Sequence, residues 1–257
     1  MGNDCYGYGI IEVCDACSHI NLWNGYNIGH NYDSITGLYL LNKINPLCLE
    51  QIKKTCTENN GNSINNSLVN NITNIEPRLI LEVLDRTEIN LSISEVPQFN
   101  NFYNATKGMI DYLMTVDSTN YLDAGTFFTD EHNKPEARRK YGEEHLKLST
   151  QLGFSVMPTT NGLKKSAQIS PFGIQCATIE YSLLKRMIPK LIMRVPIISY
   201  MIKKAKTEPV SIRETMFSIN MKESTINRRG TCIKTLLSIL NQTNDDELQL
   251  RLTQIQW

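Results

Sequence analysis

Apolar residues in the second half of the chain recur three or four positions apart, the spacing that places side chains on one face of a helix. In the stretch 136–152 this apolar stripe consists of Ala137, Tyr141, His145, Leu148 and Leu152. A second stretch ends at Leu240 and carries Ile226, Ile233, Leu236, Leu237 and Leu240. The sequence therefore predicts a mainly α fold, with small β-hairpin wings as its strands.

The size and composition of the chain are those of a globular protein. Its 257 residues suffice for one large domain or two to three small ones. No apolar run reaches the roughly 18 residues that would span a bilayer, and the N-terminus lacks the order of a signal peptide. The seven cysteines form no dense scaffold, so we expect mostly reduced thiols. These features predict a soluble, cytoplasmic protein.

Positive charge is concentrated in residues 134–234, although the whole chain has a formal net charge of zero. That segment holds 19 Lys and Arg against 7 Asp and Glu, an excess of +12. Residues 1–133 hold 6 against 16, and residues 235–257 hold 1 against 3. A cluster of cations repels itself unless it meets phosphates, whose counterions it releases. The asymmetry indicates a polyanionic partner, and a solvated basic face without a partner is the alternative.

Residues 118–176 follow the order of a winged helix-turn-helix unit. A short helical pattern over 120–128 precedes the long helix 136–152, which Gly153 is suited to end. Two strand-like segments come next, at 154–157 and 163–170. They flank Asn161-Gly162, a pair that accepts the positive φ angles of a tight hairpin turn. We expect this hairpin to be the wing.

Residues 177–257 predict a helical linker followed by a second helix-turn-helix unit. The linker consists of two apolar helices, over 178–193 and 195–206, and Pro196 suits the first turn of the second. Ser211 can cap a short helix over 212–219, after which Asn220 can adopt the left-handed turn conformation. Ser224 or Thr225 can then cap the longer helix to Leu240.

Two stretches resemble known DNA-binding modules. The sequence from Ser211 to Leu237 looks like the helix-turn-helix of many bacterial DNA-binding proteins, in which Ser-Thr and then two arginines open the recognition helix. The sequence from Glu136 to Phe154 resembles the second helix of another winged unit, which commonly ends in Leu-Gly before its wing. Tandem units of these kinds are similar to the recognition regions of some type II restriction endonucleases and bacterial defence proteins. This resemblance covers residues 118–240 and implies sequence reading more than cleavage.

The chemistry of the basic residues predicts their roles on double-stranded DNA. An arginine fork pairs with guanine O6 and N7, and an asparagine amide pairs in the same way with adenine N6 and N7. Lysines are better suited to phosphates, which set register without reading sequence. The expected DNA-binding set is Arg138, Arg139, Lys140, Lys147, Lys164, Lys165, Lys222, Ser224, Thr225, Asn227, Arg228, Arg229 and Lys234. Ordinary exposed helix residues are the alternative interpretation.

Catalytic and metal motifs are weak. No Asp/Glu-x-Lys tripeptide occurs, and the nearest variant is Gln51-Ile52-Lys53 with Asp33 upstream. His132-Asn133 followed by His145 superficially resembles a ββα-metal nuclease, although His145 falls on the apolar face of its helix. Cys5, Cys14, Cys17 and His19 have zinc-like spacing on one side only, whereas a structural zinc site needs four ligands. We expect no metal and no cofactor, and the catalytic residues, if any, are unknown.

Residues 1–117 predict an acidic helical domain of unknown role. Helical patterns cover 34–43, 46–54, 77–85 and 104–116, a polar loop is expected at 55–74, and a short strand at 88–96. The aromatic residues around 23–39 suit an interface with a second copy or a partner subunit, or a packed core.

The leading functional expectation is a sequence-preferring double-stranded DNA-binding protein, the DNA-recognition component of a restriction or defence system. A dimeric transcriptional regulator would instead use residues 1–117 for dimerisation and recognise a palindromic site. A type II restriction endonuclease would carry a Mg²⁺-dependent site in its N-terminal half.

Overall fold

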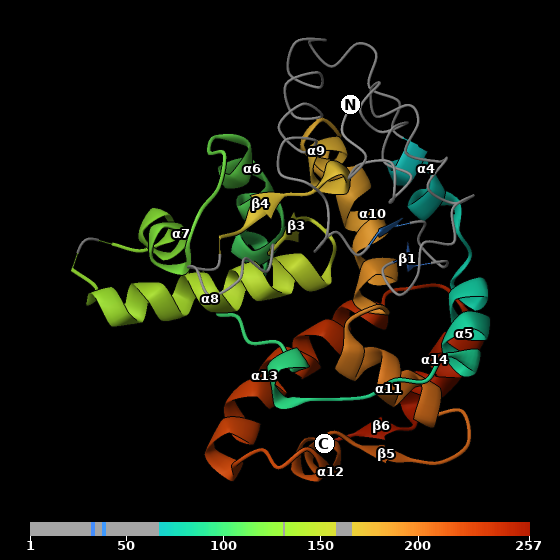
Figure 1. Cartoon of the computed structure of the whole chain (residues 1–257). Helices are drawn as coiled ribbons and strands as arrows, with labels where there is room; N and C mark the ends of the chain where they lie inside the picture. Colours follow the sequence, from blue (N-terminus) through green and yellow to red (C-terminus); the bar gives the residue numbers. More distant parts are fainter. Residues whose placement is uncertain (1–31, 34–37, 40–66, 131, 158–165) are drawn as a thin grey trace, which may run out of the picture. The chain divides into compact units, whose positions relative to one another are not determined.

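The computed structural model describes residues 32–33, 38–39, 67–130, 132–157 and 166–257 (Figure 1). Of these residues 65% are helical, in 11 α-helices with a few short strands, which confirms the mainly α fold. The chain divides into two compact units, residues 1–74 with 101–184 and residues 75–100 with 185–257. Each unit therefore combines two separate segments of the sequence.

The first unit is built around a long helix, α8. Its described helices are α4 (Ser67–Asn74), a π-helical turn (Asn104–Gly108), α6 (Met109–Met114), α7 (Tyr121–Phe128), α8 (Pro135–Gln151) and α9 (Pro171–Ala177). Its short strands pair antiparallel, β1 (Tyr32–Asp33) with β2 (Leu38–Tyr39) and β3 (Ser155–Val156) with β4 (Gln168–Ile169). Phe154 and Phe172 are fully buried and stack with ring centroids 5.6 Å apart. This pair packs the residue before β3 against α9 and forms one part of the core of this unit.

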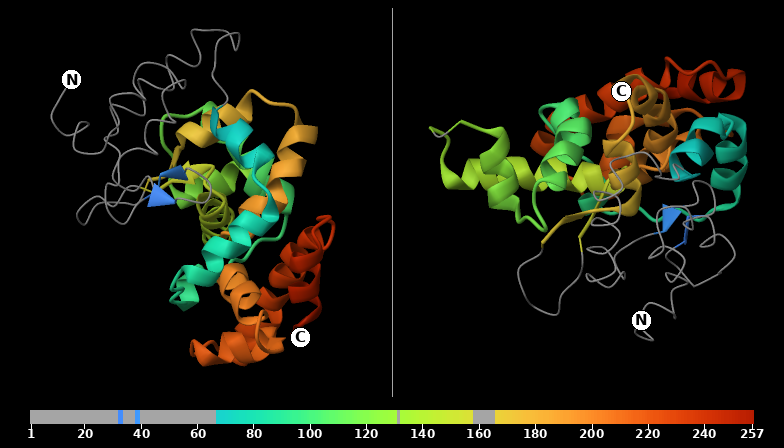
Figure 2. Two further views of the ribbon diagram at one scale, coloured as in Figure 1. Left: turned by 90° about the vertical axis from the view of Figure 1, so that its right-hand side faces the viewer. Right: turned by 90° about the horizontal axis from the view of Figure 1, so that it is seen from above.

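Two glycines allow α7 to lie against the first half of α8 (Figure 1 and Figure 2). A Cβ added at Gly125 would lie 1.7 Å from the carbonyl oxygen of Arg138, and one at Gly142 would lie 2.0 Å from that of Tyr121. Asn120 caps α7, because its side-chain oxygen accepts hydrogen bonds from the backbone N–H groups of Leu122 and Asp123. The two helix backbones approach so closely that a methyl group does not fit between them.

The end of α8 follows the expectation from sequence. Gly153 has φ 86°, the left-handed conformation that glycine adopts without strain. Its N–H donates to the carbonyl oxygen of Thr150 at 3.0 Å, and the N–H of Phe154 donates to the carbonyl oxygen of Ser149 at 2.9 Å. These two bonds form a Schellman motif, which satisfies carbonyl groups left over at a helix end.

The second unit contains the predicted C-terminal helices. Its helices are α5 (Pro77–Arg86), a 3-10 turn (Ile93–Glu95), α11 (Pro196–Lys204), α12 (Ile212–Ser218), α13 (Glu223–Leu240) and α14 (Asp246–Thr253). A further helix, α10 (Tyr181–Ile192), begins in the first unit and ends in the second. Strand β5 (Val210–Ser211) pairs in parallel with β6 (Ile255–Gln256), so the last residues lie beside the start of α12 (Figure 1). The helices expected over 77–85, 104–116, 120–128, 178–193 and 195–206 are confirmed, with Pro196 in the first turn of α11.

Three local predictions for the N-terminal half are wrong. Residues 67–74 are helical rather than a polar loop, because Val69 and Ile72 are buried and the Val69 N–H donates to Gln175. Residues 88–96 contain a 3-10 turn rather than a strand. It is stabilised by the N–H of Ser92, which donates to the Glu95 carboxylate at 2.6 Å. The helix expected at 34–43 is contradicted at 38–39, which form β2 by pairing with β1.

The apolar stripe of α8 is confirmed except at its start. His145, Leu148 and Leu152 are buried and Tyr141 is half-buried, but Ala137 is exposed. The first turns of α8 contact α7 through the backbone of Arg138, so Ala137 faces solvent instead. The predicted helix at 46–54, the wing tip with Lys164 and Lys165, and the zinc candidates Cys5, Cys14, Cys17 and His19 lie outside the described residues. So do Gln51, Ile52 and Lys53. The two described cysteines, Cys176 and Cys232, are free thiols as expected.

Candidate nucleic-acid interface

Helices α12 and α13 are joined by a four-residue turn, residues 219–222, in the order of a helix-turn-helix. Ser211 caps α12, since its hydroxyl accepts the N–H of Glu214 at 3.1 Å. Asn220 has φ 61°, the left-handed conformation that asparagine tolerates better than most residues. Both features were predicted from sequence and are confirmed. The buried residues Met216 and Ile226 come from opposite sides of the turn.

The start of α13 differs from the prediction that Ser224 or Thr225 caps it. The helix begins at Glu223, with Lys222 at the N-cap position and no side-chain cap. Glu223 instead forms an ion pair with Arg213 of α12. A carboxylate in the first turn is favoured by the helix dipole, and this pair links α12 to the beginning of α13. Ser224 and Thr225 thereby become members of the first turn.

The outer face of α13 is polar and carries no acidic residue after Glu223. Its exposed residues recur three or four positions apart, which places them in one band along the helix; they are Ser224, Asn227, Arg228, Thr231, Lys234, Thr235 and Ser238. The opposite side is buried and includes Ile226, Ile233 and Leu236. We call the exposed band the α13 face.

Arg229 has a contact that its sequence neighbours do not share. Its Nη1 donates to the carbonyl oxygens of Ile93 at 2.7 Å and Val96 at 2.8 Å, and the side chain is half-buried. Both carbonyl groups belong to the 3-10 turn and the residue after it. The guanidinium therefore attaches α13 to this turn, whereas Arg228 is exposed on the α13 face.

Trp257 lies against α13 close to Lys234. The Lys234 Nζ is 4.1 Å from the centroid of the indole ring, a cation-π arrangement. A Cβ added at Gly230 would lie 2.0 Å from the same ring. The parallel pairing of β6 with β5 brings the indole to this position.

The basic residues predicted on α8 are partly neutralised within the helix. Lys147 pairs with Glu143 at 2.6 Å, and Lys140 lies 3.5 Å from Glu143 and 3.6 Å from Glu144. Burial raises the pKa of Glu143, but its hydrogen bonds and attraction to these lysines outweigh burial and the pKa is lowered. Arg138 is half-buried and Arg139 is exposed. The α8 surface is thus less cationic than a count of its lysines suggests.

His145 is a core residue of the first unit. Its ring is fully buried and stacks on Tyr141 with centroids 3.9 Å apart. Nδ1 lies 2.8 Å from the Tyr141 carbonyl oxygen, and Nε2 accepts the N–H of Asn101 at 3.3 Å. The suggested ββα-metal site of His132 and His145 is therefore wrong, because both ring nitrogens bind the backbone. No group of three or more potential metal ligands occurs among the described residues.

The chain matches no protein-family model, no curated protein and no solved structure. Within the described part of the chain, no helix is long and apolar enough to cross a membrane.

Proposed function

We propose that this protein binds double-stranded DNA with sequence preference through the α12–α13 pair, with α13 entering the major groove. The observation that carries the proposal is the α13 face, which presents Asn227 and Arg228 near the start of a helix without acidic neighbours beyond Glu223. A recognition helix contacts base edges mainly through its N-terminal residues. The capped α12 and the left-handed Asn220 hold α13 in a fixed geometry.

The residues of the α13 face differ in the contacts that they can make with DNA. Arg228 can pair bidentately with guanine, and Asn227 can pair with adenine. Ser224 and Thr231 offer hydroxyl groups to bases or phosphates, and Lys222 offers a phosphate contact. Arg229 positions α13 through Ile93 and Val96. Sequence reading therefore depends on Arg228 rather than on both arginines.

The first unit supplies a second DNA-contacting element in this proposal. The order of α7, α8 and the β3–β4 hairpin agrees with a winged helix-turn-helix. Arg139 is exposed on α8, and Lys164 and Lys165 belong to the connection between the strands. Their role is phosphate contact, which adds affinity without sequence information. The tandem units would make the protein the recognition component of a restriction or defence system, in which residues 1–117 contact a second copy or a partner subunit.

The test is selection from random-sequence duplex DNA in about 100 mM salt, where a cationic surface of this size still binds measurably. Bound and cut products are both sequenced, with and without Mg²⁺. Enrichment of a defined sequence supports the proposal, and Mg²⁺-dependent ends would add cleavage to it. Failure to retain any duplex at this salt concentration would overturn it.

A further inference from the structure

Trp257 is held beside α13 by the short parallel pair of strands. Strand β6 pairs with β5, and the Val210 N–H donates to the Gln254 carbonyl oxygen at 2.8 Å. Trp257 directly follows β6, and α12 directly follows β5. The two strands therefore fix the position of the indole relative to the helix-turn-helix that they adjoin.

Gly230 gives the indole access to the backbone of α13. It is the only glycine of this helix, and a Cβ added to it would lie 2.0 Å from Cζ3 and 2.2 Å from Cη2 of the ring. Glycine in a helix interior is destabilising relative to alanine, and the close approach of the ring accounts for its use here. The ring occupies the space of the missing side chain, about one turn before Lys234.

Lys234 is ordered by this ring rather than by a carboxylate of its own helix. Its Nζ lies 4.1 Å from the centroid of the indole. The only acidic residue of α13 is Glu223, which lies at the start of the helix and pairs with Arg213. Attraction between a cation and the face of an aromatic ring holds the amine without cancelling its charge.

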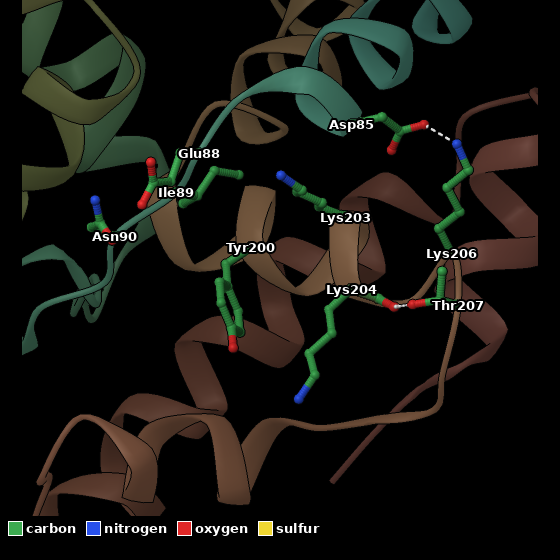
Figure 3. Close-up of a pocket in the computed structure, with 9 residues that line it drawn as sticks. All are labelled: Asp85, Glu88, Ile89, Asn90, Tyr200, Lys203, Lys204, Lys206 and Thr207. Carbon is green, nitrogen blue, oxygen red and sulfur yellow. Dashed lines mark hydrogen bonds and ion pairs between the residues drawn. The ribbon is translucent and has the colours of Figure 1, made fainter.

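Two other lysines show the more common arrangement, in which a carboxylate holds the amine. Lys147 pairs with Glu143 at 2.6 Å, and the Lys206 Nζ donates to Asp85 Oδ2 at 2.6 Å, the bond drawn beside Lys206 in Figure 3. A carboxylate opposes the charge of the lysine and competes with phosphate for its N–H donors. Lys234 differs in that its ammonium group is held in place and keeps its charge for a polyanion.

The α13 face places Lys234 where the DNA backbone would pass. With about 3.6 residues per turn and a rise of about 1.5 Å per residue, Lys234 lies roughly 10 Å beyond Asn227 along the helix axis. The same spacing puts Thr231 in the middle of the α13 face and Lys234 at its edge, next to Gly230. A recognition helix contacts base edges mainly through its N-terminal residues. A lysine two turns further on, at the edge of the face, is placed for a phosphate.

We propose that Trp257 is a positioning residue for DNA binding, which holds the Lys234 ammonium group toward a backbone phosphate while α13 reads bases. The inference rests on the proposed function of α13 and adds to it a residue from outside the α12–α13 pair. A lysine side chain that is ordered before binding loses less conformational entropy in the complex. The contact adds affinity without sequence information, because phosphates set only the register.

The pairing is tested first in the free protein by NMR. The ring current of the indole should shift the resonances of the methylene protons next to the Lys234 Nζ upfield, and Lys234→Gln assigns these resonances by their loss. Trp257→Leu should abolish the shift, whereas Trp257→Phe, which keeps an aromatic ring, should retain most of it. Unshifted resonances in the wild type would overturn the proposal without any measurement on DNA.

The effect on binding is then measured with a duplex of about 20 base pairs at several salt concentrations. Lys234→Gln should weaken binding and reduce the slope of log K against log salt by about 1. Trp257→Leu should lose about two- to fivefold in affinity, as expected for one exposed cation-π pair, and Trp257→Phe should recover most of this loss. In a Lys234→Gln background, Trp257→Leu should cause no further loss, because the ring acts through the lysine.

Phe217→Leu is the matched control for removal of an exposed ring. Phe217 is 43% exposed and Trp257 42%, and the Arg213 Cζ lies 5.5 Å from the Phe217 centroid. Arg213 is also held by Glu223, so this variant should bind DNA as the wild type does. Thermal melts accompany all variants.

Two results on DNA would overturn the positioning role while DNA binding by α13 stands. One is wild-type affinity of Trp257→Leu at every salt concentration. The other is an equal loss from Trp257→Leu with and without Lys234, which would assign the effect to the fold. If the wild type retains no duplex at about 100 mM salt, the proposed function itself fails and the positioning role fails with it.

Discussion

Asp85 accepts two hydrogen bonds from Arg251, one from Nη1 at 2.6 Å and one from Nη2 at 2.9 Å. The arginine side chain is 3% exposed and that of the aspartate 18%. Hydrogen bonds from Arg251 lower the pKa of Asp85 to about 2, with a further contribution from Lys206 and against the effect of burial. This pair connects α5 to α14, and its two residues are 166 positions apart in the sequence.

Replacing Asp85 by Asn should destabilise the protein by about 2–3 kcal/mol, because it leaves Arg251 buried with only Glu247 as its anionic partner. The change is measured by urea unfolding at neutral pH. Glu82→Gln is the control, since its pair with Arg78 is exposed at both side chains and should change the stability by less than about 0.5 kcal/mol. Equal losses in the two variants would contradict a structural role for the Asp85–Arg251 pair.

His145 should make the stability of the protein depend on pH below neutrality. Burial lowers the pKa of His145 below its usual 6.5, against the raising effect of the Tyr141 carbonyl oxygen at Nδ1. The unfolded chain therefore binds a proton more readily than the folded chain, and stability falls as the pH decreases from about 6.5 toward the folded pKa. Protonation also removes the acceptor that Nε2 offers to the Asn101 N–H.

The measurement is the free energy of unfolding in urea at several values between pH 7 and pH 5. His145→Gln should reduce the dependence on pH in this interval. His132→Gln, which changes an exposed histidine, should leave it as in the wild type. A wild-type protein equally stable across the interval would show that His145 does not titrate with unfolding.

Gly125→Ala should destabilise the first unit by about 3 kcal/mol or more, because the added methyl group overlaps backbone atoms that cannot move independently. The overlap is with the carbonyl group of Arg138, at 1.7 Å from oxygen. Gly108→Ala is a milder comparison, since its nearest neighbour is a side-chain atom of Phe128 at 3.2 Å. Thermal melts of both variants measure the difference. If Gly125 were in ordinary packing, the two alanine variants would lose the same amount of stability.

Gly230→Ala should displace the indole of Trp257 from α13, since the added Cβ would lie 2.0 Å from the ring. The protein contains two tryptophans, so the variant is made in a Trp23→Phe background in which Trp257 is the only indole. We expect its fluorescence emission to shift to longer wavelength as the ring becomes more exposed. Ser238→Ala, an exposed change on the same helix, should leave the emission unchanged.

Local rules predicted much of the helical framework and less of the surface chemistry. Ser211, Asn220 and Gly153 were identified because caps and left-handed turns depend on only a few neighbouring residues. The ion pairs of Lys140 and Lys147 with Glu143 have spacings of three and four residues, so the reduced charge of α8 was accessible from sequence.

The other differences arise from contacts between residues distant in sequence. Arg229 binds carbonyl groups at Ile93 and Val96, which are 136 and 133 residues away. Lys206 and Asp85, which form an ion pair, are 121 residues apart. No periodicity or motif records such pairs, because they are produced by tertiary packing. The sequence thus suggested two equivalent arginines at the start of α13, and their different roles became visible only in the folded unit.

The different roles of Arg228 and Arg229 can be tested by replacing each arginine separately. Arg228→Ala should relax the preferred DNA sequence at one position by about 1–3 kcal/mol and leave the melting temperature unchanged. Arg229→Ala should instead lower the melting temperature, because the Ile93 and Val96 carbonyl groups lose their donor. Lys164→Ala with Lys165→Ala should weaken binding to all sequences alike, as expected for phosphate contacts. Selection from random duplexes and thermal melts measure both properties. If Arg229→Ala relaxed specificity as Arg228→Ala does, without loss of stability, both arginines would read bases and the positioning role of Arg229 would be wrong.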